Sequence, residues 1–261
     1  MRHHQDTIKN FTRFQAARPE VLGVAVVGSV ARGDERSDSD VDVYVVITDD
    51  AYADAERQGR IAFVSHDGVT YAGGYVDVKL CSPGYLAAAV ERADDPTRAS
   101  FLHARVTLDR IGGLAETVEA ITELPEEVWR RRVNAYQAQV ALYGGYFLPQ
   151  AYERGDGFLL HHSAVHTAFA AGRTALAHHR RLFRGQKYLN KDIAGLSELP
   201  ASFRTAWTSV LADASPTTAA ALIGEIDSLV GSSLSVDESL SRFITDNELA
   251  WLNGTIPPEF W

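Results

Sequence analysis

The most constraining feature of this chain is a pair of aspartates at the start of a run of β-branched residues. Asp40 and Asp42 lie in the segment Asp-Val-Asp-Val-Tyr-Val-Val-Ile, which otherwise has the composition of a buried strand. Residues two apart on a strand project from the same face, so the two carboxylates point together while Val41 and Val43 point into the core. Two adjacent carboxylates repel each other unless a cation binds between them. Oxygen ligands favour a hard divalent cation, Mg²⁺ first.

A glycine–serine turn precedes the aspartates and follows another β-type run, Val21 to Val27. Gly28 allows close approach of the backbone to a ligand, and Ser29 offers a hydroxyl group. If a helix starts at this turn, its free N–H groups would hold a phosphate. A phosphate-binding turn beside a metal-binding carboxylate pair predicts a site for a nucleoside triphosphate.

The segment between the turn and the aspartates has a simpler reading. A stretch rich in Asp, Ser and Gly between two strands is most often a solvated loop, and residues 34–38 could be only that. Asp40 and Asp42 differ because they interrupt a buried strand. A carboxylate buried there without a partner costs several kcal/mol or shifts its pKa.

The spacing of these residues resembles the signature of the DNA polymerase β-like nucleotidyltransferase superfamily. That signature is Gly-Ser, ten intervening residues and then Asp-x-Asp on a strand. The resemblance covers roughly the first half of the chain and is carried by Gly28, Ser29, Arg32, Gly33, Ser39, Asp40 and Asp42. The superfamily uses a third carboxylate on a later strand, and Asp77 in the alternating run Tyr75 to Leu80 fills that position.

The resemblance implies transfer of a nucleoside monophosphate from a triphosphate to an acceptor hydroxyl, with release of pyrophosphate. Asp40 and Asp42 would hold the metals, and Asp77 would hold the metal nearest the acceptor hydroxyl. Two Mg²⁺ ions about 3.5–4 Å apart can stabilise both the entering and the leaving oxygen. Asp77 could also accept the hydroxyl proton, or metal coordination alone could lower the pKa of that hydroxyl.

The resemblance also implies contacts to the triphosphate, of ATP or another NTP. Gly28 and Ser29 would hold the β- and γ-phosphates. Arg32 and Ser39 would add second contacts, with stabilisation of their own loop as the alternative role. In the second half of the chain, Lys187 and the weaker candidate Lys191 are four residues apart on one helical face and could reach the triphosphate, or form a solvated pair.

A second pattern in that half is a stripe at helical spacing, for which packing is the usual role. It comprises His162, His166, Phe169 and Arg173.

The hydrophobic pattern predicts an α/β (α+β) domain with a mixed sheet over residues 1–124, followed by an all-α helical bundle over 125–261. For the first domain we expect helices at 5–18, 85–92 and 114–121 and strands at 21–27, 41–47, 60–65, 69–80 and 105–109. A turn at His66-Asp67-Gly68 would return the chain to Asp77 through an antiparallel hairpin. For the second domain we expect helices at about 126–152, 158–183, 187–197, 201–213, 216–232 and 237–252, the first disturbed by Gly144-Gly145 and Pro149.

The net charge of the chain and its distribution indicate which kind of acceptor the protein could bind. The chain has a net charge of −9, which argues against a long nucleic-acid footprint. Residues 125–195 carry ten Lys/Arg against five Asp/Glu, whereas residues 196–261 carry two against nine. An acidic chain suits a polycationic acceptor, and the layout is similar to that of small-molecule nucleotidyltransferases such as aminoglycoside and lincosamide resistance enzymes.

Two other functions stay open from the sequence. Related minimal enzymes modify tRNA ends or proteins, some in toxin–antitoxin pairs, and the basic segment 125–195 supports that reading. A nucleotide-binding regulator that transfers nothing is the third reading.

The single cysteine, Cys81, excludes a disulfide framework and is expected in the core. Lacking a basic head with an apolar stretch and any run of membrane-span length, the sequence predicts a cytoplasmic protein.

Overall fold

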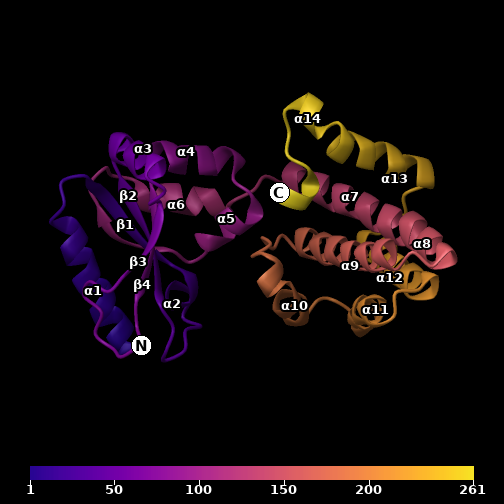
Figure 1. Cartoon of the computed structure of the whole chain (residues 1–261), viewed down its shortest axis with the longest axis horizontal. Helices are drawn as coiled ribbons and strands as arrows, with labels where there is room; N and C mark the ends of the chain where they lie inside the picture. The colour runs from indigo at the N-terminus through magenta and orange to yellow at the C-terminus, as the bar shows by residue number, and fades with distance from the viewer. The chain divides into compact units, whose positions relative to one another are not determined.

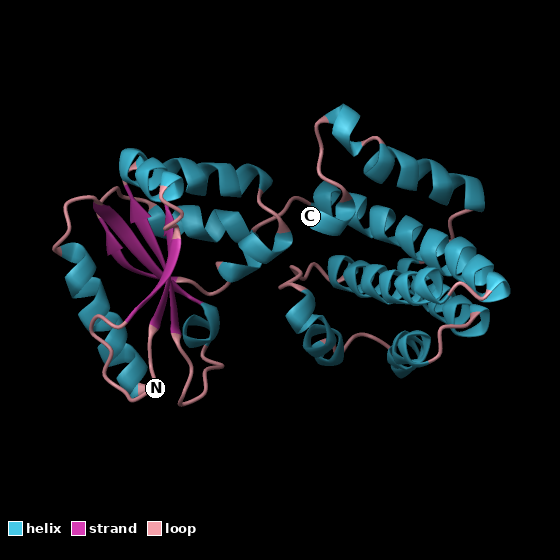
Figure 2. Cartoon of the chain, in the orientation of Figure 1, coloured by secondary structure: helices cyan, strands magenta, loops and turns pink.

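The computed structural model describes residues 1–261, which form two compact units, Met1–Glu123 and Leu124–Trp261. The first unit is built on a five-stranded sheet with the strand order β3-β4-β2-β1-β5, drawn in magenta in Figure 2. The strands are β1 (Val21–Val27), β2 (Val41–Ile47), β3 (Ala62–Ser65), β4 (Val76–Cys81) and β5 (Arg105–Asp109).

The sheet is mixed because β2 and β4 run parallel while every other neighbouring pair is antiparallel. The hairpin predicted around His66-Asp67-Gly68 is present between β3 and β4. It reverses the chain after β3, so that β4 runs alongside β2 in the same direction. The fold class expected from the sequence is confirmed.

Helices cover both faces of this sheet (Figure 1). On one face, Ile8 and Phe11 of α1 pack against the valines of β1, β2 and β4. On the other, α4 and α6 pack against residues such as Tyr44 and Cys81, which is fully buried. The helices of this unit are α1 (Arg2–Ala16), α2 (Gly28–Arg32), α3 (Asp49–Arg57), α4 (Pro83–Arg92), α5 (Asp95–Ser100) and α6 (Leu114–Thr122).

In the first unit, the structure differs from the predicted elements at one strand and at two short helices. The expected strand 69–80 begins only at Val76, because residues 68–70 are bonded to α1 instead of a strand. The helices α3 and α5 were not predicted. Both are short and capped at the N-terminus by a side chain, Thr48 for α3 and Asp94 for α5.

Arg98 on α5 ties two helices of this unit together. Its buried guanidinium donates to the carbonyl oxygens of Val90 at 3.0 Å, Ala93 at 2.9 Å and Ile121 at 2.8 Å. These carbonyls lie at the C-terminal ends of α4 and α6, where helices lack internal donors and favour cations.

We expect an Arg98→Leu variant to lower the free energy of unfolding by about 3–5 kcal/mol, because three buried carbonyls lose their donor. Urea denaturation followed by circular dichroism measures the change. Arg92→Leu is the matched control, since Arg92 is exposed and should change stability by less than about 0.5 kcal/mol. Equal stability of the two variants would contradict this role of Arg98.

The second unit is helical (Figure 2). Its core lies around the alanine-rich helix α9, whose small side chains pack with Phe203, Trp207 and Leu222. The elements are α7 (Glu126–Leu142), the π-helical turn η1 (Tyr143–Phe147), α8 (Leu148–Arg154), α9 (Gly157–His178), α10 (Gln186–Gly195), α11 (Ala201–Ala212), α12 (Pro216–Val230), α13 (Val236–Phe243), the π-helical turn η2 (Ile244–Glu248), α14 (Ala250–Asn253) and the 3-10 turn η3 (Pro258–Phe260).

The helix predicted over 126–152 is present as α7, η1 and α8 in direct succession, with the π-helical turn η1 at Gly144-Gly145. A Cβ on Gly144 would lie 2.9 Å from Cγ2 of Thr167 on α9, so glycine permits close contact between the two segments. Pro149 is tolerated because it lies in the first turn of α8. The helix predicted to reach residue 183 ends at His178, and the one predicted over 237–252 is interrupted by η2.

The chain shows no helix that combines the length and the apolar character needed to cross a membrane.

Candidate functional site

Three aspartates converge at one end of the sheet. Asp40 directly precedes β2, Asp42 lies on β2, and Asp77 lies on β4. The parallel register pairs Asp42 with Asp77, and one carboxylate oxygen from each of the three residues lies within 4.8 Å of the others. Val41 and Val43 are buried on the opposite face, as the alternation predicts. The structure therefore brings together the three acids that the sequence singled out.

The electrostatics of this cluster are unfavourable for three negative charges. The pKa of Asp42 is raised to about 6, first by burial and then by the charges of Asp40 and Asp77. Lys79 and Arg32 oppose the shift. Without a bound cation, ionisation of Asp42 therefore costs more free energy in the folded protein than in water.

The donor set fits a hard divalent cation. It offers only carboxylate oxygens, the ligands that Mg²⁺ prefers, and a divalent charge would reverse the repulsion that raises the pKa of Asp42.

Gly28 is required by the position of Asp42. At the start of α2, Gly28 has φ = 70°, a conformation that favours glycine. A Cβ built on it would lie 1.9 Å from Oδ2 of Asp42. The sequence predicted that Gly28 lets the backbone approach a ligand, and the structure shows a second reason for the glycine: the Asp42 carboxylate fills the space beside it.

The other residues of the first unit that the sequence predicted to contact the triphosphate are placed as follows. Ser29 is half-buried in the first turn of α2. Arg32 has its Nε 3.3 Å from Oδ1 of Asp34, and its charge lowers the pKa of Asp42. The hydroxyl of Ser39 accepts a hydrogen bond of 2.9 Å from the Arg36 amide, so it stabilises its own loop.

Two further residues, Tyr75 just before β4 and Lys79 on it, belong to the site and were not assigned from the sequence. The Tyr75 hydroxyl hydrogen-bonds to the Asp40 carboxylate, and this bond is the main cause that raises the pKa of Tyr75. Lys79 lies two residues after Asp77, with its Nζ 5.8 Å from the centre of the Tyr44 ring. Residues 75, 77 and 79 alternate along the chain with the buried Val76 and Val78, so once Asp77 is assigned, strand periodicity also indicates these two neighbours.

The candidates in the second unit lie on α10 and α9. Lys187 and Lys191 are exposed on α10, with the Lys187 ammonium 5.5 Å from the centre of the Tyr188 ring. In the stripe, the His166 ring stacks on Tyr143 with ring centres 4.7 Å apart. The buried Arg173 donates to the carbonyl of Trp261 at 2.9 Å, so this member of the stripe contributes to packing.

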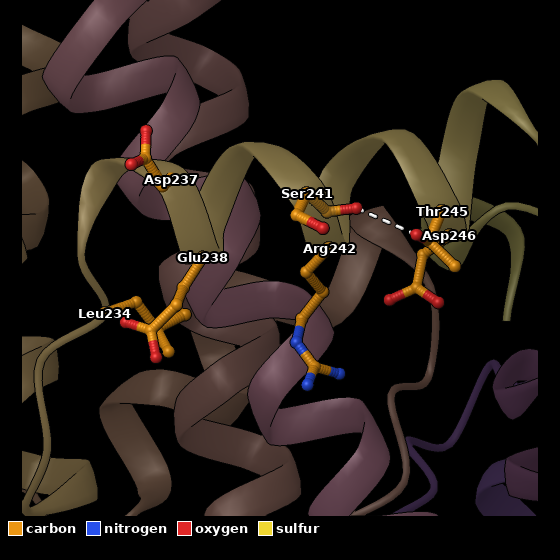
Figure 3. A pocket seen from close by; sticks show the side chains of 7 residues that line it. All are labelled: Leu234, Asp237, Glu238, Ser241, Arg242, Thr245 and Asp246. Atoms are coloured by element: carbon orange, nitrogen blue, oxygen red, sulfur yellow. Dashed lines mark hydrogen bonds between the residues drawn. The ribbon is translucent and has the colours of Figure 1, made fainter.

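The second unit also contains a cavity of about 520 Å³ along α13 and η2, shown in Figure 3. Its charged residues are Asp237, Glu238, Asp246 and Arg242, three acids against one base. Burial raises the pKa of Asp246, while the charges of Arg131 and Arg242 act in the opposite direction.

Comparison with known proteins agrees with the chemistry of the first unit. Residues 7–98, which include all three aspartates, match the family model of the nucleotidyltransferase domain. A solved structure that resembles the chain is a nucleotidyltransferase-like protein from Exiguobacterium sibiricum; it has 16% identity and a TM-score of 0.49, over 94% of this chain and 80% of that one. No curated protein matches the chain. The domain match implies an NTP substrate and a divalent metal, and makes the chain a transferase.

Proposed function

We propose that this member of the DNA polymerase β-like nucleotidyltransferase superfamily transfers a nucleoside monophosphate, AMP before others, to a hydroxyl of a small antibiotic-like molecule of the aminoglycoside or lincosamide type. Asp40, Asp42 and Asp77 would be the catalytic carboxylates. The observation that carries the proposal is their convergence within 4.8 Å beside the Gly28-Ser29 turn. Nucleotidyl transfer needs a binding site for a polyphosphate next to oxygen ligands for a cation; the three carboxylates would supply the ligands, and the Gly28-Ser29 turn would bind the polyphosphate.

The reaction forms one phosphorus–oxygen bond and breaks another. The acceptor hydroxyl oxygen attacks the α-phosphorus, the bond to the bridging oxygen between the α- and β-phosphates breaks, and pyrophosphate leaves. The hydroxyl proton must go to a base, and Asp77 is the carboxylate we assign to the acceptor side. Gly28 and Ser29 would orient the β- and γ-phosphates, with Arg32 as a further cationic contact near Asp42.

Two Mg²⁺ ions held by Asp40, Asp42 and Asp77 would neutralise the charge that develops on the entering and leaving oxygens. The protein's own contribution is orientation. Because Asp42 and Asp77 are register partners on adjacent strands, their carboxylates are held by the sheet rather than by a loop. Lys187 and, less directly, Lys191 would add positive charge against the triphosphate.

The charges of the second unit support a cationic small acceptor over RNA. Of the ten basic residues in 125–195, Arg132 and Arg173 are buried, and Arg180 and Arg184 form ion pairs with Glu126 and Asp192. This use of basic residues leaves less positive surface for a phosphate backbone.

The cavity of Figure 3 is lined by three acids and one base, so its charge favours a cationic ligand, whereas an RNA-binding groove is basic. Its volume of about 520 Å³ is within the range of small-molecule sites. These features support a compact polycationic acceptor.

The test is an assay that follows a radiolabel from the α-phosphate. The protein, Mg²⁺ and each α-labelled NTP are incubated with pooled aminoglycosides and lincosamides, with total tRNA, or with cell lysate. We expect label from ATP on a small molecule, and none with Asp42→Asn. Asp38→Asn, a change in an exposed aspartate of the loop before β2, is the matched control and should retain transfer. Label on RNA or protein would replace the small acceptor with a macromolecular one, and bound NTP without any transfer would favour a regulator.

A further inference from the structure

One backbone carbonyl next to the aspartate cluster accepts two side-chain donors. The Ser39 carbonyl oxygen lies 3.0 Å from Nε2 of His4 and 2.6 Å from the hydroxyl of Tyr71. Ser39 immediately precedes Asp40, so these bonds fix the peptide that carries the first carboxylate. The two donors come from segments 32 and 35 residues away in the sequence.

His4 is placed for this contact at some cost. Its side chain is fully buried on α1, and its Nδ1 is buried without a hydrogen-bond partner, 3.9 Å from Oε1 of Glu35. Because a carbonyl only accepts, the proton must be on Nε2. A buried imidazole is tolerated where it is hydrogen-bonded, and the bond to the Ser39 carbonyl satisfies its Nε2–H.

Tyr71 is held by the same helix. Its ring contacts the His3 ring, with centres 4.6 Å apart, and the His4 ring, with centres 5.0 Å apart. The loop that carries it is bonded to α1 through Thr70, whose amide donates to Thr7 Oγ1 at 3.2 Å and whose hydroxyl donates to the His3 carbonyl at 2.9 Å. The helix therefore fixes both donors together.

Asp40 needs such support because it lies outside the strand. The ladder of β2 begins at Val41, whose amide donates to the Tyr75 carbonyl at 3.1 Å. Asp42 and Asp77 are oriented by the sheet, whereas Asp40 depends on the Ser39 contacts and on the Tyr75 hydroxyl at its carboxylate.

We propose that His4 and Tyr71 are positioning residues of the metal site, which fix the Ser39–Asp40 peptide so that the Asp40 carboxylate meets those of Asp42 and Asp77. This inference rests on the proposed function, because it gives the N-terminal helix a role in that same site. Residues that orient metal ligands typically change metal affinity by about 10–100-fold when they are removed.

The test compares His4→Leu with His4→Gln. Leucine removes the donor, whereas the glutamine amide nitrogen has a reach similar to that of imidazole Nε2. Tyr71→Phe removes only the hydroxyl and keeps the ring. Lys9→Leu is the control, because Lys9 lies on the same helix but is exposed and makes none of these contacts. Mn²⁺ binding is measured by electron paramagnetic resonance of free Mn²⁺ with a non-hydrolysable NTP present, and unfolding midpoints are measured in EDTA.

We expect the Mn²⁺ dissociation constant to rise at least about tenfold in His4→Leu and Tyr71→Phe, and to stay within about threefold in His4→Gln and Lys9→Leu. If His4→Leu does not fold, Tyr71→Phe decides the question. Unchanged Mn²⁺ affinity in Tyr71→Phe and in any folded His4→Leu would overturn the inference while the proposed function stands. Equal loss in His4→Leu and His4→Gln, together with a lower unfolding midpoint, would reduce His4 to a structural residue and overturn its assigned role. Failure of the wild-type protein to bind Mn²⁺ would instead refute the proposed function.

Discussion

An Asp42→Asn variant is expected to lose nucleotidyl transfer by about 10³-fold or more while it keeps its fold. The asparagine amide cannot replace a carboxylate ligand between Asp40 and Asp77, and the metal contribution to such a transition state amounts to several kcal/mol. Pyrophosphate release measured under saturating Mg²⁺ and NTP gives the loss directly. Near-normal turnover of this variant would refute the metal-site assignment.

The same substitution should stabilise the metal-free protein. The pKa of Asp42 is about 6 in the folded state, above the value of about 3.9 for an unperturbed aspartate. The destabilisation that Asp42 contributes is therefore absent below about pH 4 and grows as the pH rises towards 6, because over this range the unfolded chain ionises Asp42 more readily than the folded one. Asparagine cannot ionise, so the unfolding midpoint of the variant in EDTA should exceed that of the wild type at pH 8 and approach it at pH 4. A lower midpoint at pH 8 would contradict the repulsion described for the three aspartates.

A Gly28→Ala variant should lose transfer by about 10²-fold or more, because a displacement of about 1 Å at a catalytic group has an effect of this size. The added methyl group would overlap Oδ2 of Asp42 at 1.9 Å, so the carboxylate must move. Single-turnover rates and Mn²⁺ affinity report the displacement separately from stability.

Gly33→Ala is the matched control for this change. Gly33 also has a positive φ, 76°, and a Cβ there would meet no atom within 4 Å. Both variants carry the cost of a left-handed alanine, about 1 kcal/mol, but only Gly28→Ala moves a carboxylate. Equal loss of transfer in the two variants would show that backbone strain, not the contact with Asp42, is responsible.

The sequence predicts the elements of the first unit where a regular pattern is strong. The valine-rich runs give β1 and β2 with the bounds that the structure shows, because runs so rich in β-branched apolar residues favour a buried strand. Residues 69–75 have the composition of a strand, but Thr70 is hydrogen-bonded to Thr7 and His3 of α1, a tertiary contact that the local sequence does not contain. The short helices α3 and α5 depend on a single capping residue each, which is a weaker signal than a hydrophobic stripe.

The residues of the site also fall into those that the sequence indicates and those that depend on tertiary contacts. Strand periodicity places Asp40 with Asp42, and the family resemblance adds Asp77; periodicity around Asp77 then extends to Tyr75 and Lys79. His4 and Tyr71 could not be found from the sequence, since their common partner is the Ser39 carbonyl, a backbone atom that carries no residue identity.

The parallel pairing of β2 with β4 also gives the acids a part in folding specificity. A slip of either strand by one residue would turn Asp42 or Asp77 towards the valines beneath α1 and turn Val43 or Val78 outwards. An ionised carboxylate in that apolar layer would cost several kcal/mol, so misregistered sheets are disfavoured before any ligand is present. The residues that make the native cluster unfavourable in the absence of a cation thus also exclude the competing alignments of the chain.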